Sequence, residues 1–398
     1  MKLLVATDTH LYKTPDGHYW CPTMFGKKFY GRYLGKFEKV RIAARCKEVD
    51  QVNEKWLQVD APGIEFFELP FYQGPIQLAK KYFRIKKCLK NVADSCDVAI
   101  FRMPSPTANL VYKEVKKHTS IPIGAEIIYD PTDELNNKDV HLLKKLVAYS
   151  FSLQLKDICH NANGVSYVTE FAIQKNFPSR ARVLGESNCF FESFYSSIDL
   201  PDSAFGTPRD YKNKKSFVIA HSNMSMNDNR KGELVLIQAL KILIQGGYDV
   251  SLVFMGDGSK RNQFEKAAND LGIDNNVNFI GLLSDPREVT QVLQSADFYV
   301  LPTLAEGLPR GIIEAMAQGL VCISSPVGGI SELLDTNNLI DPLNSALYAK
   351  RIEELINNSD EMNKLSEENI RKARKYESRL LQKRRDEFYQ KLIEIADA

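Results

Sequence analysis

Two glutamates, Glu306 and Glu314, flank a glycine- and proline-containing turn in the stretch EGLPRGIIEA. The apolar run ADFYVLP precedes the stretch, and Pro309 suits the first turn of a helix. The pattern predicts a strand that turns into a helix, with the Gly307 and Leu308 amides at a helix N-terminus that favours an anion. Carboxylates at such a turn accept hydrogen bonds from sugar hydroxyls, as they do for ribose in dinucleotide folds, or serve as simple helix caps.

A basic turn, Arg230-Lys231-Gly232, follows the polar loop HSNMSMNDN at the expected start of another helix. Cations at a helix N-terminus oppose the helix dipole, so the position indicates either a bound anion or a solvated turn. Gly281 ends the apolar run NFIG, where a flat base can approach the backbone closely. The stretch MGDGSKR lacks the third glycine of the dinucleotide fingerprint, which disfavours a nicotinamide enzyme.

Turns of this kind lie between a strand and a helix, and the apolar pattern along the chain predicts strands that alternate with helices. Alternation of this kind predicts parallel sheets in α/β domains. Strands are expected at 2–7, 39–45, 97–103, 122–128 and 164–169, and again at 216–221, 250–256, 276–281, 296–302, 320–325 and 338–341. Helices are expected at 76–92, 135–160, 231–245, 259–271, 285–295, 309–318 and 343–357.

Residues 196–215 are polar, contain two prolines and show no periodicity, so they are expected to link two domains. We place the first domain at 1–200 and the second at 214–372, with a final helical segment at 373–398. Both domains read as doubly wound, and ligands of such sheets bind outside the carboxyl ends of the strands. A site in a cleft between the two domains is expected.

Taken together, EGLPRGIIEAMAQG, VGGISELL, the upstream Lys231-Gly232 and the G-x-G of MGDG resemble the retaining nucleotide-sugar glycosyltransferases of family 4. The resemblance covers most of 216–341. In the first half, EIIYDPTDEL resembles a segment found in members that build bacterial surface polysaccharides such as capsule, exopolysaccharide and lipopolysaccharide. It implies the GT-B fold, with two facing Rossmann-like doubly wound domains, and a last helix, 373–398, that crosses back to the first domain.

The resemblance also implies roles for single residues. Glu306 and Lys231 would be catalytic: Glu306 would hold donor-sugar hydroxyls, and Lys231 would neutralise the diphosphate in place of a metal ion. Glu314 would hold the ribose hydroxyls. The remaining expected donor contacts are Gly307, Leu308 and Pro309 beside the diphosphate or sugar, and Gly281 and Leu282 beside the base. Family members carry an arginine where this chain reads His221-Ser222-Asn223, so Arg230 or the Asn223 loop is expected to bind phosphate.

The first domain departs from the family pattern too, because the loop after its first strand reads TDTHLYKTPDGHYWCP (7–22) instead of carrying a Gly-Gly pair. This long aromatic loop is expected to shape the acceptor side. Each of the acceptor-side candidates could equally be an ordinary polar residue at a strand end. These candidates are His10, His18, Arg102, Ser105, Glu126 and Asp130.

Charge is uneven along the chain: residues 1–200 carry 28 Lys and Arg against 22 Asp and Glu. A basic half favours an anionic partner such as a membrane surface, a lipid diphosphate or nucleic acid. Residues 77–90, QLAKKYFRIKKCLK, have the composition of an interfacial amphipathic helix, although an ordinary surface helix would fit as well. Because lipid-linked acceptors lie at membranes, we expect peripheral membrane contact here and no nucleic-acid partner.

Seven scattered cysteines, none in a CxxC motif, favour a reducing cytoplasmic compartment without structural zinc. Since no apolar run reaches the ~18 residues of a membrane span, we expect a cytoplasmic protein at the inner face of the cell membrane. No cofactor or metal is expected, and the nucleotide sugar is the substrate.

The leading interpretation is a retaining transferase that moves a hexose from a nucleotide-diphosphate donor, UDP favoured over GDP, to a growing lipid-linked surface glycan. A nucleotide-sugar epimerase or a phosphorylase of the same fold would look similar. A non-catalytic nucleotide-sugar-binding or membrane-scaffold protein is the alternative from another class. The missing arginine favours that alternative, whereas Glu306, Glu314 and Lys231 favour an enzyme.

Overall fold

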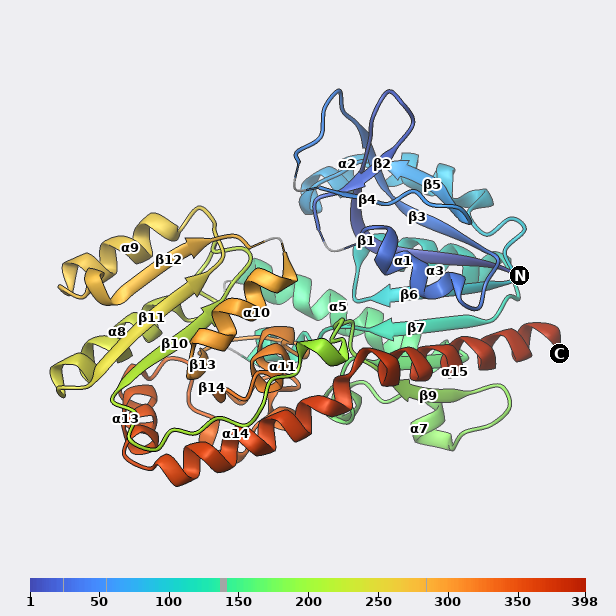
Figure 1. Ribbon diagram of the computed structural model, residues 1–398. Helices are drawn as coiled ribbons and strands as arrows, with labels where there is room; N and C mark the ends of the chain where they lie inside the picture. Colours follow the sequence, from blue (N-terminus) through green and yellow to red (C-terminus); the bar gives the residue numbers. More distant parts are fainter. Residues whose placement is uncertain (24, 55, 137–141, 284) are drawn as a thin grey trace. The chain divides into compact units, whose positions relative to one another are not determined.

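Figure 1 shows the computed structural model of the chain, which divides into two compact units. Unit 1 comprises Met1–Thr132, His141–Tyr195 and Gln382–Ala398, and unit 2 comprises Asp133–Val140 and Ser196–Leu381. The structure describes residues 1–23, 25–54, 56–136, 142–283 and 285–398. Each unit is built on its own sheet.

Parallel strands form the centre of unit 1 in the order β5-β3-β1-β6-β7-β8-β9. The central runs LLVA of β1 and VAIF of β6 are apolar throughout because helices cover both faces of the sheet. The strands are β1 (Lys2–Lys13), β3 (Lys39–Glu48), β5 (Ile64–Pro70), β6 (Val98–Met103), β7 (Ile123–Ile127), β8 (Gly164–Tyr167) and β9 (Phe191–Phe194).

The expectation of a loop over 7–22 is wrong for its first half, because β1 runs on to Lys13. After a register shift, His10 to Lys13 pair with Arg45 to Glu48 of β3. The same extension pairs antiparallel with β2 (Tyr19–Cys21), which in turn pairs with β4 (Leu57–Gln58). The pairings with β3 and β4 join segments far apart in sequence, so local pattern does not reveal them.

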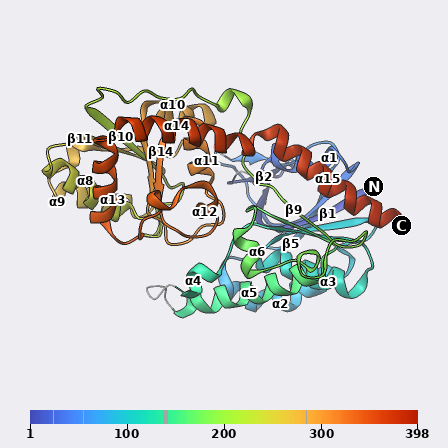
Figure 2. The ribbon, with the colours of Figure 1, turned by 90° about the horizontal axis from the view of Figure 1, so that it is seen from below.

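Helices α2 (Gly74–Cys88), α3 (Pro106–His118) and α5 (Leu142–Asn161) cover one face of this sheet, below it in Figure 2. On the opposite face lie α1 (Lys27–Leu34) and α15 (Ser378–Asp397). Two short helices complete the unit: α6 (Ala172–Asn176) and α7 (Arg180–Leu184). Helix α4 (Thr132–Asn136) starts at the last residue of the first segment of unit 1, and its other residues belong to unit 2. Part of the helix expected at 135–160 falls on 137–141, outside the described residues. Among those described, no helix is both long and apolar enough to cross a bilayer.

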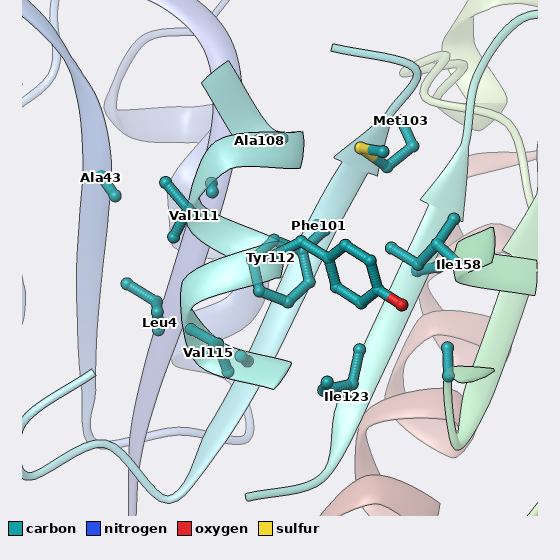
Figure 3. Packing of buried hydrophobic residues seen from close by; sticks show 14 of the residues in the cluster. Leu4, Ala43, Phe101, Met103, Ala108, Val111, Tyr112, Val115, Ile123 and Ile158 are labelled. Atoms are coloured by element: carbon teal, nitrogen blue, oxygen red, sulfur yellow. The ribbon is translucent and has the colours of Figure 1, made fainter. Parts of the chain in front are cut away.

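Helix α3 is the clearest case of sequence setting the packing of unit 1. Its apolar residues Ala108, Val111 and Val115 recur every three or four positions and point at the sheet (Figure 3). The ring of Tyr112 meets that of Phe101 edge-on, with 5.5 Å between centroids. The core of unit 1 therefore lies between β6 and this helix layer.

The last helix, α15, completes the other side of the same unit. A Cβ atom added at Gly124 would lie 2.7 Å from Leu392, and one at Gly164 would lie 2.9 Å from Phe388. Both strands thus have a residue without a side chain at the position where α15 packs against them. Tyr389 is also buried and its hydroxyl lies 3.4 Å from Glu126 on β7. Residues 382–398 therefore belong to the interior packing of unit 1.

Unit 2 has a parallel sheet in the order β12-β11-β10-β13-β14, which is the 3-2-1-4-5 order of a doubly wound fold. The strands are β10 (Ser216–Ser222), β11 (Asp249–Met255), β12 (Val277–Gly281), β13 (Phe298–Leu301) and β14 (Val321–Ser324). The helices are α8 (Glu233–Gln245), α9 (Arg261–Asp270), α10 (Pro286–Ser295), α11 (Arg310–Ala317), α12 (Ile330–Leu333), α13 (Ser345–Ile356) and α14 (Ser359–Ala373).

Two expectations for this half need correction. Much of the stretch 196–215 is packed rather than a free linker, because Tyr211 is buried in the core of unit 2 and Arg209 donates to the Gln318 carbonyl at 3.0 Å. The strand expected at 338–341 is reduced to one bridge between Ser324 and Leu339, since a turn of 3-10 helix occupies Thr336–Asn338.

Candidate functional site

A cavity of about 920 Å³ opens in unit 2 at the carboxyl ends of its central strands. Ser222 at the end of β10 and Leu301 at the end of β13 both line it. The strand order reverses between these two strands, and doubly wound sheets bind ligands at that point. Of the residues predicted to bind a donor, those that line the cavity are Asn223, Arg230, Lys231, Leu282, Glu306, Leu308, Pro309 and Glu314. Gly281 and Gly307 are chain neighbours of lining residues.

The side chains of Lys231 and Glu306 form an ion pair at this cavity, although 75 positions separate them in sequence. Burial lowers the pKa of Lys231 to about 8, and the nearby cations Arg230 and Arg310 act in the same direction. A partly desolvated ammonium group of this kind binds a further anion strongly, because little water has to be displaced. The pair therefore places one positive and one negative group where a ligand can contact both.

Gly232 fixes the backbone between Lys231 and the start of α8. It has a φ of +79°, and a Cβ atom there would lie 2.2 Å from the carbonyl oxygen of Pro302. Only glycine fits both this conformation and this approach. The lysine is thus held against the segment that follows β13, where Glu306 stands.

A network of buried polar side chains stabilises the loop that carries Lys231. The Asn223 amide donates to Glu233 Oε1 at 2.5 Å, and His221 Nδ1 donates to the Val300 carbonyl at 2.9 Å. His221 Nε2 lies 3.8 Å from the same Glu233 oxygen. Burial by itself would raise the pKa of Glu233, but His221 and Asn223 hold it below its usual value. The Asn223 side chain is therefore committed to the loop: its oxygen also accepts from the Ser225 amide at 3.1 Å.

Glu314 lies on the second turn of α11 and lines the cavity. Burial raises the pKa of its carboxyl group, and Arg310 only partly offsets this. Among the residues that the structure describes, none donates a hydrogen bond to this carboxylate. A carboxylate placed in this way has its full accepting capacity available to the hydroxyl groups of a ligand.

Two lining hydroxyls near Glu314 were not singled out from the sequence. Ser222 Oγ and Tyr299 OH lie 2.6 Å apart, and a Cβ atom on Gly311 would lie 2.3 Å from the tyrosine oxygen. Gly311 therefore allows α11 to approach the sheet end closely. A tyrosine inside the buried run ADFYVLP is the signal that sequence reasoning could have used.

The loop before α11 is held by the Gly328-Gly329 turn. Gly328 has a φ of +53°, and its hypothetical Cβ would lie 2.0 Å from the carbonyl oxygen of Glu306. The Gly329 amide donates to the Gly307 carbonyl at 2.6 Å. Pro309 is the residue before the helix, so α11 begins one position later than expected.

The remaining donor candidates take more peripheral positions. Arg230 is exposed and pairs with Asp228 at 2.7 Å, at the rim of the cavity. Gly281 has a φ of +82° where β12 ends, and its carbonyl accepts from the Gly256 amide at 2.7 Å. Leu282 follows it and lines the cavity.

In unit 1, Arg102 and Glu126 form an interior ion pair with 2.5 Å between Nη1 and Oε2. Tyr33 and Tyr195 donate to the same carboxylate at 3.1 and 3.0 Å. The prediction that these two charged residues line the acceptor side is therefore corrected: both are almost wholly buried, and their groups are used within the unit.

Three of the other acceptor-side candidates, Ser105, Asp130 and His18, have hydrogen-bond partners within unit 1. Ser105 caps α3 by accepting from the Ala108 amide, and Asp130 accepts from the Thr132 amide, at 3.0 and 2.8 Å. His18 is exposed, and Asp60 at 2.8 Å raises its pKa. Burial lowers the pKa of His10, which stands on the β1 extension. Within the described ranges, no three His, Cys, Asp or Glu side chains form a cluster that could hold a metal ion.

The sequence that forms this cavity is similar to that of known proteins. Residues 212–373 match the family model described as glycosyl transferases group 1. The chain is 27% identical over 380 residues to Protein CapJ of Staphylococcus aureus, covering 94% of this chain and 90% of that protein. It is also 31% identical over 103 residues to an Escherichia coli protein named UDP-Gal:alpha-D-GlcNAc-diphosphoundecaprenol alpha-1,3-galactosyltransferase, covering 25% of this chain and 26% of that protein.

Solved structures resemble the chain over nearly its whole length. Sucrose-phosphate synthase (tll1590) from Thermosynechococcus elongatus gives a TM-score of 0.73 at 15% identity, covering 99% of both chains. HepE of Anabaena, solved with UDP and glucose, gives 0.66 at 16% identity, covering 98% of this chain and 99% of that chain. These likenesses confirm the predicted GT-B fold. The chain therefore has the GT-B fold, built from two Rossmann-like units.

Proposed function

We propose that this protein is a glycosyltransferase that moves a hexose from a nucleoside diphosphate donor, UDP favoured over GDP, with retention of configuration at the sugar. The observation that carries the proposal is the cavity in which Lys231, Glu306 and Glu314 meet. It offers a partly desolvated cation for a diphosphate, and two carboxylates for hydroxyl groups of the donor. HepE, a structural neighbour, was solved with UDP and glucose.

In this proposal each residue acts on a different part of the donor. Glu314 accepts hydrogen bonds from the ribose hydroxyls, and Glu306 accepts them from the donor sugar. Lys231 stabilises the negative charge that develops on the diphosphate as the glycosidic bond breaks, a role that needs no metal ion. The loop at Gly307 and Leu308 and the end of β12 at Gly281 complete the contacts.

The chemical step follows from this distribution of charge. The bond from the anomeric carbon to the diphosphate oxygen breaks, and the acceptor oxygen bonds to the same face of that carbon. The acceptor hydroxyl proton passes to the departing phosphate oxygen. Exclusion of water from the cavity limits wasteful hydrolysis of the donor.

The acceptor is proposed to be a growing, lipid-linked glycan of a surface polysaccharide. The name of the Escherichia coli relative specifies a sugar on diphosphoundecaprenol, a lipid of this kind. We therefore place the protein in the cytoplasm at the inner face of the membrane, with residues 77–90 as one contact. That segment lies within α2 and its continuation, and its basic side chains are largely exposed.

The test is donor turnover by the purified protein against a panel of nucleotide sugars. Slow release of nucleoside diphosphate is expected from one of them, and both Glu306→Ala and Lys231→Ala should lower it at least about a hundredfold. Lys260→Ala removes a lysine that does not line the cavity and should leave the rate unchanged. Unchanged rates in both cavity variants, with circular dichroism showing intact folds, would overturn the site. Conversion of the donor into an epimer instead would overturn the transfer reaction.

A further inference from the structure

Helices α2, α3 and α5 form a layer on one face of the unit 1 sheet (Figure 2). Their inner sides meet in the core, where Ile85, Val111 and Leu155 are buried from the three helices in turn. Lys116 of α3 pairs with Asp157 of α5 at 3.1 Å. The outer side of this layer includes the basic stretch 77–90.

The outer side of α5 carries an apolar stripe. Leu142, Leu146, Tyr149 and Leu153 are spaced four, three and four positions apart, which aligns them on one side of a helix. Their exposed fractions run from 69% at Leu142 to 50% at Leu153. Scattered exposed leucines are ordinary, but an aligned row of large apolar side chains marks a binding surface.

Helix α2 presents a second stripe with the same spacing. Ile76, Lys80, Phe83 and Lys87 are all exposed, and Phe83 reaches 84%. A phenylalanine so exposed among lysines has no partner to shield it within the described chain beyond the edge-on ring of Tyr82. Alternation of apolar and basic groups on one helical side is typical of segments that lie at a lipid headgroup layer.

Charge on the layer is mainly positive. Helix α2 has five cationic side chains and no carboxylate, while α3 and α5 have three cationic side chains each against a single carboxylate each. The cations are Lys80, Lys81, Arg84, Lys86, Lys87, Lys113, Lys116, Lys117, Lys144, Lys145 and Lys156, and the carboxylates are Glu114 and Asp157. Such a surface complements an anionic partner.

We propose that α5 is a membrane-insertion element and that, together with α2, it seats unit 1 on an anionic lipid bilayer. The α5 stripe enters the boundary between headgroups and acyl chains, with Tyr149 at the level where amphipathic rings collect. The lysines of α2 and α3 meet lipid phosphates. This inference deepens the proposed function, because it brings the enzyme to the surface that holds a lipid-linked acceptor.

A second copy of the chain is the other candidate occupant, and charge argues against it. In a two-fold dimer the same patch faces itself, so the cations of α2 and α3 would be set against their own copies. A bilayer with anionic headgroups meets both the apolar stripe and the cations with the matching chemistry. On such a bilayer both the apolar and the basic side chains favour binding, whereas in the dimer the basic side chains would repel each other.

Vesicle sedimentation of the full chain tests the proposal. Phosphatidylcholine vesicles with phosphatidylglycerol should bind the protein, and pure phosphatidylcholine vesicles should bind it far less. The double variant Leu146→Ser with Tyr149→Ser should lower binding by at least about tenfold, because two apolar side chains no longer enter the lipid. Lys80→Glu with Lys87→Glu should lower it similarly and reduce its dependence on salt.

Leu343→Ser in unit 2 is the matched control, because Leu343 and Leu146 are both 57% exposed. It should leave vesicle binding unchanged. Absence of binding to anionic vesicles, or an α5 variant that binds as well as the Leu343 variant, would overturn the inference. Dimerisation in sedimentation velocity that the α5 variant abolishes would assign the stripe to a second copy instead. Donor hydrolysis in vesicle-free buffer should be unaltered in every variant, so failure here is distinct from failure of the proposed reaction.

Discussion

The side-chain amide of Asn223 lies 2.5 Å from Oε1 of Glu233, and both side chains are almost wholly buried. Asn223 follows the end of β10, and Glu233 is the first residue of α8. The hydrogen bond therefore joins the two ends of the loop that carries Lys231. Asn223, which also lines the cavity, therefore helps to hold the loop that carries Lys231.

Replacing Asn223 by alanine should leave the Glu233 carboxylate short of a donor in a buried place. We expect the free energy of unfolding to fall by about 1–3 kcal/mol, as for other unsatisfied buried groups. Urea unfolding measures this. Asn229→Ala removes an exposed amide of the same loop and is the control; equal unfolding midpoints for the two variants would refute the supporting role.

Gly232→Ala and Gly247→Ala form a matched pair. Both glycines have positive φ, +79° and +85°, but a Cβ meets Pro302 at the first position and nothing within 4 Å at the second. Gly247→Ala should cost about 1–2 kcal/mol from backbone strain. Gly232→Ala should cost more and also weaken nucleoside diphosphate binding, because Lys231 moves. Thermal unfolding and calorimetric titration separate the two effects, and an equal loss in both variants would show that the contact with Pro302 is unimportant.

Glu314→Gln should weaken nucleotide binding while stabilising the protein. Because burial raises the pKa of Glu314, the folded state holds its proton more tightly than the unfolded chain does. The ionised carboxylate therefore destabilises the fold above its folded pKa, and this effect vanishes below about pH 4, where an ordinary carboxyl is protonated. Unfolding at neutral and acid pH, with Glu367→Gln as an exposed control, checks the sign. Lower stability at neutral pH would contradict it.

Binding of a nucleoside diphosphate should take up protons above about pH 8. Burial lowers the pKa of Lys231 to about 8, and a bound diphosphate raises it again. Affinity should therefore fall as pH rises from about 7 to about 8.5, a range in which an ordinary lysine stays charged. Calorimetry in buffers of different ionisation enthalpy measures the uptake. Lys231→Met should bind weakly with no such uptake, and a flat pH profile in the unaltered protein would refute the prediction.

Phe388→Ala should destabilise unit 1, although residue 388 stands near the end of the chain. Its ring is buried against Phe191 and Tyr195, with centroids 5.2 and 5.8 Å away. A cavity of this kind costs about 3–5 kcal/mol. Leu380→Ala, on a more exposed part of α15, is the control for helix propensity. Chemical denaturation followed by tyrosine fluorescence reports the difference, and similar losses in the two variants would refute interior packing.

Much of unit 2 could be predicted from its sequence, because its strands are short apolar runs bounded by glycine turns. Local pattern indicates the strand-to-helix turns that carry Lys231 and Glu306, and the family resemblance implies donor contacts for both and for Glu314, which lies on the second turn of α11. The strand β5 was missed because its run, IEFFELP, mixes acidic and half-exposed residues. The acceptor-side residues could not be sorted, since only the fold shows that Arg102 and Glu126 face each other inside unit 1.

The position of α15 has a consequence for how the protein is made. Its residues from 382 onward fill the bare surface over Gly124 and Gly164, yet they are translated after all of unit 2. The sheet of unit 1 therefore keeps part of its interior exposed to solvent until α15 has been synthesised. Unit 2 needs no residue after Leu381 and can therefore complete its fold before unit 1, although most of unit 1 is synthesised first.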